Sequence, residues 1–140
     1  MTAGDDRRPE GRRRVVIESL APSVDCGEFP VKRIVGERVD VEADVFADGH
    51  DRIACVLKYR AAGERAWREA EMRPVGNDRW RGAFVVERLG RYEYTVAGWI
   101  DRFASWRHDF ARREDPADVA VALEVGAELV RDAAERAGAA

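Results

Sequence analysis

Three regularly spaced carboxylates are the first residues whose types could do chemistry. Asp40, Glu42 and Asp44 alternate with valine and alanine, and this period of two predicts an extended strand that carries all three carboxylates on its solvated face. A cation site requires ligands that converge on one point, whereas neighbours on one face of a strand point outward in parallel. The pattern therefore favours a charged strand surface over a metal site.

The histidines and cysteines do not form a recognisable catalytic or metal-binding set. His50 is expected in a turn and His108 near the end of an extended segment, and no Cys-x-x-Cys pair is present. Cys55 lies in an apolar stretch and is interpreted as a core residue rather than a nucleophile, because no base is visibly paired with it. No P-loop, Gly-x-Gly-x-x-Gly or Gly-x-Ser-x-Gly motif occurs. We therefore predict no catalytic residue, no metal ligand and no cofactor-binding residue.

Tryptophan is the one residue type in surplus, with four in the chain. Exposed indole rings can stack on the apolar faces of sugars, and Trp99 is out of phase with the alternating apolar residues around it. Trp67, Trp99 and Trp106 are therefore candidates for sugar or interface contacts. Core and interface packing is the more frequent use of tryptophan, so this alternative carries more weight.

Composition limits the location and the partners. The N-terminus is polar and contains no secretory signal, so Cys26 and Cys55 are expected to be unpaired cytosolic thiols. No apolar run approaches the ~20 residues of a membrane helix. The net charge of −3 gives no general attraction to nucleic acid. We expect a soluble cytoplasmic protein with no membrane partner and no nucleic-acid partner.

Residues 79–100 predict the two strands that build the sheet core. The apolar positions of the two strands alternate with polar or small ones: Trp80, Phe84 and Val86, then Tyr92, Tyr94, Val96 and Ile100. The run from Gly90 to Tyr94 is similar to the corner of immunoglobulin-like sandwiches, in which a tyrosine hydroxyl bonds to the backbone. Two ordinary strands with aromatic core residues need no such bond, so both alternatives remain open.

The rest of the chain predicts further strands and then a helix. Extended segments are expected over residues 15–20, 31–34, 39–45, 53–60, 66–72 and 101–110. Asp115 is a suitable N-cap and Pro116 is favoured in a first helical turn, so a helix is expected from Ala117 to Ala137. Its apolar face is predicted to hold Val119, Leu123, Val130, Ala134 and Ala137.

The fold class is therefore mainly β, with about seven strands followed by one C-terminal helix. The segment 1–13 has no apolar periodicity and is expected to be a disordered tail. The sandwich is expected over residues 14–113 and the helix over residues 114–140.

Several segments resemble one family of enzymes. The similarity is carried by Phe29-Pro30-Val31-Lys32-Arg33, by Ala47-Asp48-Gly49-His50-Asp51, by Asn77-Asp78-Arg79-Trp80-Arg81-Gly82 and by residues 90–107. These segments resemble the N-terminal domain of the α-1,4-glucan:maltose-1-phosphate maltosyltransferases, over about residues 14–110. Two departures are visible, because Cys26 stands where the family usually has a glycine and Gly98 stands where alanine is common.

This resemblance implies an immunoglobulin-like sandwich with a helical insertion that starts near Asp115, in front of an α-amylase-like barrel on the same polypeptide. It also implies the parent reaction, in which maltosyl is transferred from maltose 1-phosphate to an α-1,4-glucan with retention and release of phosphate. The catalytic aspartate and glutamate of the family lie on the barrel, so no catalytic residue is carried over to this chain. The implied role is packing on the barrel and a share in a homodimer interface, with the chain ending inside the helical part. An autonomous carbohydrate-binding module and a protein-interaction sandwich remain as alternatives.

Overall fold

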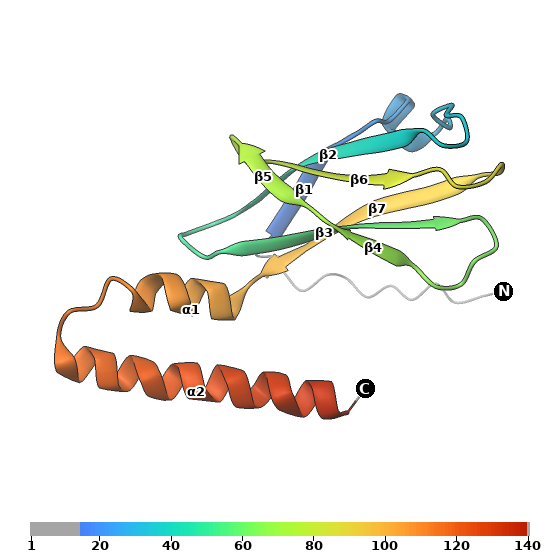
Figure 1. Cartoon of the computed structure of the whole chain (residues 1–140). Coiled ribbons are helices and arrows are strands. Elements are labelled where there is room, and N and C mark those ends of the chain that lie inside the picture. Colours follow the sequence, from blue (N-terminus) through green and yellow to red (C-terminus); the bar gives the residue numbers. More distant parts are fainter. Residues whose placement is uncertain (1–14, 140) are drawn as a thin grey trace, which may run out of the picture.

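Residues 15–139 are described by a computed structural model, in which seven strands form two antiparallel sheets (Figure 1). The four-stranded sheet has the order β1-β2-β6-β5 and the three-stranded sheet has the order β4-β3-β7. The strands are β1 (Val15–Ala21), β2 (Arg38–Ala47), β3 (Ile53–Ala61), β4 (Arg68–Glu71), β5 (Arg73–Gly76), β6 (Arg79–Val85) and β7 (Tyr92–Ile100). The prediction of a mainly β sandwich with about seven strands is confirmed. The tail expected over residues 1–13 lies outside the described residues.

The core lies between the two sheets and follows the alternation of β2 and β3. The inward residues of β2 are Val39, Val41, Ala43 and Val45, and none is more than 3% exposed. Leu57 on β3 is fully buried opposite them, together with Cys55. Since alternate residues of a strand point to opposite faces, β2 turns its carboxylates outward, as the sequence predicts.

The structure lacks one predicted strand and contains one that is not predicted. Residues 31–34 form no strand, because Pro30 cannot donate a ladder bond and the amide of Ile34 bonds to the Glu37 carboxylate at 3.0 Å instead. Conversely, residues 73–76 form a strand that the sequence does not predict. Asn77 and Asp78 alone make the turn with φ of 49° and 62°, and the preceding residues are thereby free to pair with β6 as β5.

Residues 101–110 form a helix, so the prediction of an extended segment there is wrong. Helix α1 (Arg102–Phe110) begins at Asp101, whose carboxylate accepts a hydrogen bond from the amide of Ala104 at 2.8 Å. The aromatic residues Phe103, Trp106 and Phe110 are spaced i, i+3 and i+7, which places them on one helical face. The fold therefore ends in two helices rather than one.

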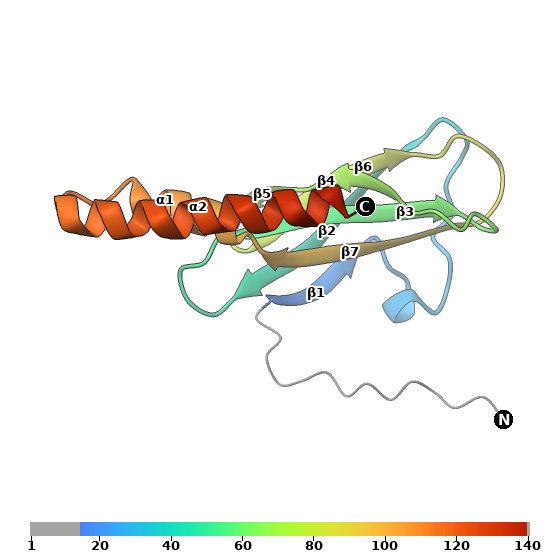
Figure 2. The same ribbon diagram turned by 90° about the horizontal axis from the view of Figure 1, so that it is seen from below.

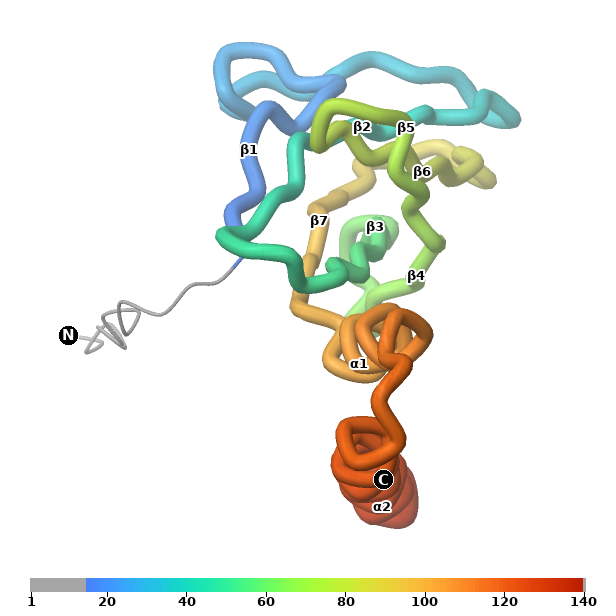
Figure 3. Tube along the Cα trace, turned by 90° about the vertical axis from the view of Figure 1, so that its left-hand side faces the viewer, coloured from blue at the N-terminus to red at the C-terminus, as the bar shows by residue number. Residues whose placement is uncertain are grey.

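Helix α2 (Pro116–Gly138) begins where the sequence predicts. The Asp115 carboxylate accepts hydrogen bonds from the amides of Ala117 and Asp118, at 2.9 and 3.1 Å. In Figures 1 and 2 the helix runs back alongside α1, and Figure 3 places α1 between α2 and the sandwich.

Helix α2 packs through small residues that lie beside its predicted apolar face. Ala122 and Gly126 are its buried residues, and the indole Nε1 of Trp106 donates a hydrogen bond to the Ala122 carbonyl at 2.7 Å. Leu123 and Val130, on the apolar face that the sequence predicts, are 51% and 55% exposed. Ala122 and Gly126 form the packed face because only small residues admit the Trp106 ring so close to the helix backbone.

A network around Arg52 joins α1 to the sandwich. The Arg52 amide donates to Ser105 Oγ at 2.7 Å, and its guanidinium Nη2 donates to His108 Nδ1 at 2.8 Å. His108 therefore lies on a helix and not at a strand end. No helix within residues 15–139 is long and apolar enough to cross a membrane.

Candidate functional site

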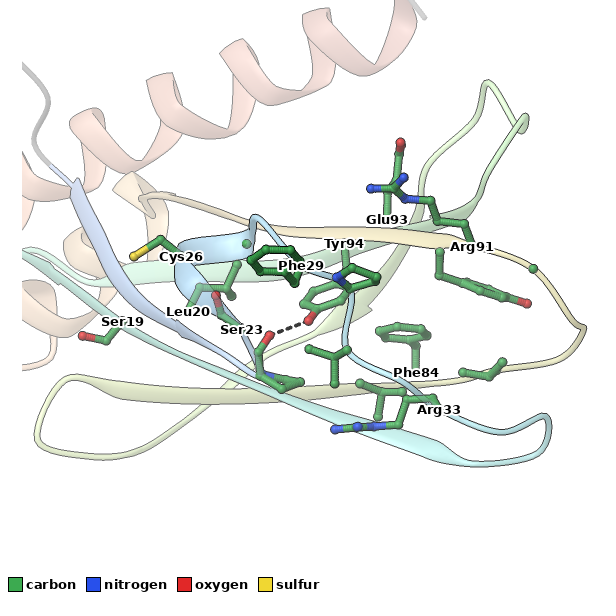
Figure 4. Close-up of a pocket in the computed structure, with 18 of the residues that line it drawn as sticks. Ser19, Leu20, Ser23, Cys26, Phe29, Arg33, Phe84, Arg91, Glu93 and Tyr94 are labelled. Atoms are coloured by element: carbon green, nitrogen blue, oxygen red, sulfur yellow. Dashed lines mark hydrogen bonds between the residues drawn. The ribbon is translucent and has the colours of Figure 1, made fainter.

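A groove of about 1040 Å³ opens at the end of the sandwich where β7 begins (Figure 4). One side is formed by the irregular segment that follows β1, and the other by the start of β7. The groove floor belongs to the core, because Val39, Phe84 and Val86 line it and are all buried. The groove is therefore a part of the core that is open to solvent rather than a separate surface cleft.

Aromatic rings form the centre of the groove. Phe84 stacks on Tyr59 with ring centroids 4.7 Å apart, and the Tyr92 and Tyr94 rings lie 6.0 and 5.8 Å from Phe84. These contacts fix the rings of β6 and β7 against each other. The floor is apolar and rigid, which suits the packing of apolar groups.

The two groove tyrosines use their hydroxyls to hold the chain. The Tyr92 hydroxyl accepts hydrogen bonds from the amides of Glu87 and Arg88, at 3.2 and 3.3 Å. The Tyr94 hydroxyl donates to the Pro22 carbonyl, and burial raises the pKa of this hydroxyl. The hypothesis of a tyrosine corner is confirmed at Tyr92, because the bond reaches the backbone just upstream of the strand. Both hydroxyls serve structure and neither is presented to a substrate.

The loop wall of the groove contains one of the departures from the resembled family. Cys26 has φ 55° and ψ 28°, which is the left-handed region where a side chain is strained and glycine is not. A glycine at this position therefore has a conformational reason. Phe29, on the same wall, is 53% exposed.

Charges of both signs surround the groove without forming an acid–base pair. Arg33 pairs with Glu37 at 3.6 Å, and Glu93 pairs with Arg60 at 2.8 Å. No histidine lines the groove among residues 15–139. In the same part of the chain, no three histidine, cysteine or acidic residues are placed to hold a metal ion.

The three carboxylates of β2 are engaged in ion pairs. Asp40 lies 3.0 Å from Arg38, Glu42 lies 2.7 Å from Arg81, and Asp44 lies 3.1 Å from Arg79, in each case measured between a carboxylate oxygen and a guanidinium nitrogen. These partners come from β2 itself and from the neighbouring β6. The interpretation as a charged strand surface accounts for all three carboxylates.

The three candidate tryptophans occupy three different environments. Trp106 lies between Phe103 and Phe110, at centroid distances of 5.3 and 5.1 Å, and serves to pack α1 against α2. The guanidinium of Arg60 lies over the Trp67 ring, 4.3 Å from its centroid, and covers one of the two ring faces. Trp99 is 46% exposed on the outer face of β7.

The structure holds Trp67 and Trp99 far apart. Trp99 is paired with Ala54 at one end of β3, whereas Arg60, beside Trp67, is six residues further along the same strand. At the rise of an extended chain this separation is about 20 Å. None of the three lines the groove. The sequence does not predict the groove, because the segment that forms its loop wall has no periodicity. Only the run from Gly90 to Tyr94 indicates one side of the groove.

The comparison with known proteins identifies the family. A family profile described as "Alpha-1,4-glucan:maltose-1-phosphate maltosyltransferase, domain N/S" matches residues 13–140. The chain belongs to this maltosyltransferase family. The resemblance found in the sequence is thereby confirmed.

Curated maltosyltransferases are similar to nearly the whole chain. The protein from Chlorobaculum tepidum is 48% identical over 133 residues, which are 94% of this chain and 20% of that protein. The Methylacidiphilum infernorum protein is 45% identical over 122 residues, or 86% of this chain and 18% of its own length. The Salinibacter ruber protein is 45% identical over 133 residues, which are 92% of this chain and 20% of that protein. The chain thus spans about a fifth of the length of these relatives.

The cysteines of this maltosyltransferase domain differ in accessibility. Cys26 is exposed and Cys55 is buried, and neither is in a disulfide. Burial raises the pKa of the Cys55 thiol from 9.0 to about 11, and Cys55 Sγ lies 3.5 Å from Met72 Sδ. Because the thiolate is the reactive form, Cys55 has neither the access nor the ionisation to react near neutral pH.

We expect a thiol reagent to label Cys26 alone in the folded protein and both cysteines after denaturation. Mass spectrometry of the labelled chain measures this directly, and Cys26→Ser is expected to abolish labelling of the folded form. Rapid labelling of folded Cys26→Ser would contradict the burial of Cys55.

The raised pKa of Cys55 also predicts a loss of folding stability at high pH. The folded state retains the Cys55 proton, so its contribution is complete below 9.0 and is lost as the pH rises through about 11.

Proposed function

We propose that this chain is the N-terminal, non-catalytic domain of a maltosyltransferase, and that it supports a catalytic barrel on the same polypeptide. The observation that carries the proposal is the extent of the family match, which covers residues 13–140 here but only about a fifth of each relative. The reaction is the transfer of maltosyl from maltose 1-phosphate to an α-1,4-glucan, as the name of the family states.

The arrangement of acidic residues supports a non-catalytic role. Retaining transfer at a glycosidic centre requires two carboxyl groups about 5–5.5 Å apart that flank the scissile bond. The carboxylates of β2 project outward side by side and are held by arginines, so they cannot enclose a sugar. The α-amylase-like barrel proposed for the remaining four-fifths of the polypeptide is the place for the catalytic pair.

The proposed activity is tested on the full-length polypeptide that carries this domain. Incubation with maltose 1-phosphate and maltoheptaose should lengthen the glucan by maltosyl units, which chromatography of the products resolves. Glucan products that grow by single glucose units, or no growth at all, would contradict the assignment.

The proposed cytoplasmic location is supported by the free thiols Cys26 and Cys55.

The proposed homodimer is supported by the uncovered face of α2. Leu123 and Val130 are seven residues apart and both more than half exposed, with Ala127 between them and Ala134 one turn beyond Val130. This spacing is typical of a helix–helix seam. In sedimentation of the full-length polypeptide, Leu123→Glu combined with Val130→Glu should therefore dissociate the dimer. Val121→Glu, at an exposed site on another side of α2, is the matched control and should leave the dimer intact.

The second candidate function is glucan binding by the sandwich itself, and the exposure of Trp99 favours it. Titration of the 140-residue chain with maltoheptaose, followed by tryptophan fluorescence, separates the two functions. A scaffold predicts no saturable change. A saturable change that is lost in Trp99→Ala would establish a carbohydrate-binding module instead.

A further inference from the structure

An apolar seam runs along α2 beside the face that packs on α1. Its members recur every three or four residues and are all exposed: Ala120, Leu123, Ala127, Val130, Ala134 and Ala137. Leu123 and Val130 are the two large side chains of the seam, 51% and 55% exposed. Apolar residues at this spacing form the line of contact between two packed helices, so the seam has the pattern of a helix–helix interface.

Helix α1 leaves the seam uncovered. Trp106 of α1 packs on Ala122 and Gly126, which lie about a quarter of a turn around α2 from the seam. Helix α1 has nine residues and α2 has 23, so more than half of α2 extends past α1 (Figure 1). A helix gains most of its stability from packing, and no other part of residues 15–139 covers the seam.

The two flanks of the seam differ in charge. On the flank away from α1 lie Glu124 and Arg131, seven residues apart, and neither forms an ion pair within residues 15–139. The flank toward α1 holds Val119, Gly126 and Ala133, none of which carries a charge. Each α2 therefore offers one carboxylate and one guanidinium along a single side of its seam.

These charges select the direction in which a second α2 lies. Parallel helices bring each flank of the seam against the opposite flank of the partner, so Glu124 and Arg131 would face uncharged residues. Antiparallel helices bring like flanks together, and Glu124 of each copy then faces Arg131 of the other. Two-fold symmetry makes this contact twice, so the surface is complementary to itself.

The same antiparallel register fits the sizes of the seam residues. It places Leu123 opposite Ala134 of the second copy, and Val130 opposite Ala127, so every large side chain meets a small one. Layers of equal volume let the two helices approach evenly, at the short end of the usual axial separation of about 8–10 Å. A parallel pair would instead stack Leu123 on its own copy and Ala127 on its own copy, which alternates crowded layers with gaps.

We infer that two copies of α2 pair antiparallel along this seam and form ion pairs between Glu124 of each copy and Arg131 of the other. The inference rests on the proposed homodimer, for which it specifies the direction, the register and the charged contacts. A second copy is the occupant that the charges fit, because it presents the same two groups in reverse order.

Charge reversal in the full-length polypeptide, measured by sedimentation, tests the ion pairs. Glu124→Arg should raise the Kd of the dimer by about tenfold, because each dimer exchanges two attractions for two repulsions. Adding Arg131→Glu should restore the Kd to within about twofold of the parent value. Asp132→Arg makes the same charge change on the side of α2 opposite the seam, and this control should leave the Kd nearly unchanged. An equal effect of Asp132→Arg, or a double variant that is not restored, would overturn the inference.

Single cysteines separate the two directions. In a Cys26→Ser background, Ala127→Cys should cross-link to its own copy, because the two positions lie within about 5 Å along the antiparallel helices. Ala137→Cys should not, because its copies lie about 25 Å apart, but it should cross-link with Ala120→Cys when the two variants are mixed. A short bifunctional maleimide, followed by mass spectrometry of the α2 peptides, identifies each link in the full-length polypeptide.

The outcomes distinguish the antiparallel seam from the homodimer on which it rests. Cross-linking of Ala137→Cys to its own copy would show a parallel pair, and a dimer without either expected link would place the interface elsewhere. Either result overturns the antiparallel seam and leaves the homodimer standing. A full-length polypeptide that sediments as a monomer would contradict both.

Discussion

Replacing Leu57 by alanine is expected to lower the free energy of unfolding by about 2–5 kcal/mol. Leu57 is fully buried at the middle of β3, where it pairs with Ala70 on one side and Val96 on the other. Both sheets converge on this side chain, and the central strands around it leave no direction in which the site can collapse. Urea unfolding followed by tryptophan fluorescence measures the loss.

Leu89→Ala is the matched control for this prediction. Leu89 is 89% exposed in the turn between β6 and β7, so the same change of side chain should alter the free energy of unfolding by less than about 0.5 kcal/mol. Equal losses for the two variants would contradict the placement of the core between β2 and β3.

Gly126→Ala is expected to loosen the α1–α2 hairpin and to leave the sandwich folded. A Cβ atom at position 126 would lie 2.3 Å from Cζ2 of Trp106, much closer than van der Waals contact allows. Alanine favours a helix over glycine by about 1 kcal/mol, whereas overpacking of this kind costs about 1–3 kcal/mol. A net loss of helix packing therefore identifies the ring contact as its cause. Hydrogen exchange of α2 and the near-ultraviolet circular dichroism of tryptophan measure it.

Gly138→Ala is the control for the helix variant, because no atom lies within 4 Å of a Cβ built at that position. It should leave exchange in the middle of α2 unchanged. The contact between Trp106 and the α2 backbone would be contradicted if Gly126→Ala kept both the exchange protection and the tryptophan dichroism of the parent chain.

The parts of the fold that the sequence predicts are those in which local rules and tertiary packing agree. The alternation of β2 correctly predicts its two faces, because its valines pack in the core while its carboxylates pair with arginines on the outer face. Asp115 and Pro116 mark the start of α2 because capping is a local interaction between near neighbours. The prediction of an extended segment over residues 101–110 is wrong because the irregular spacing of its aromatic residues is helical, and Asp101 caps α1 as Asp115 caps α2.

The candidate site was less predictable than the fold for a physical reason. The bond between Tyr94 and Pro22 joins residues that are 72 positions apart, and the loop it holds has no repeating pattern. Trp106 is a candidate for sugar contact in the sequence. Only the position of α2 shows that its indole Nε1 donates to the Ala122 carbonyl, and its ring packs between those of Phe103 and Phe110. Local sequence identifies residue types, whereas the contacts between distant segments decide their use.

We propose that this domain supports chemistry located elsewhere on a longer polypeptide. The most direct measurement is the release of inorganic phosphate from maltose 1-phosphate in the presence of glycogen, at equal molar amounts of the 140-residue chain and of the full-length polypeptide. We expect release by the full-length polypeptide and none above background by the 140-residue chain. Phosphate release by the isolated chain would contradict it.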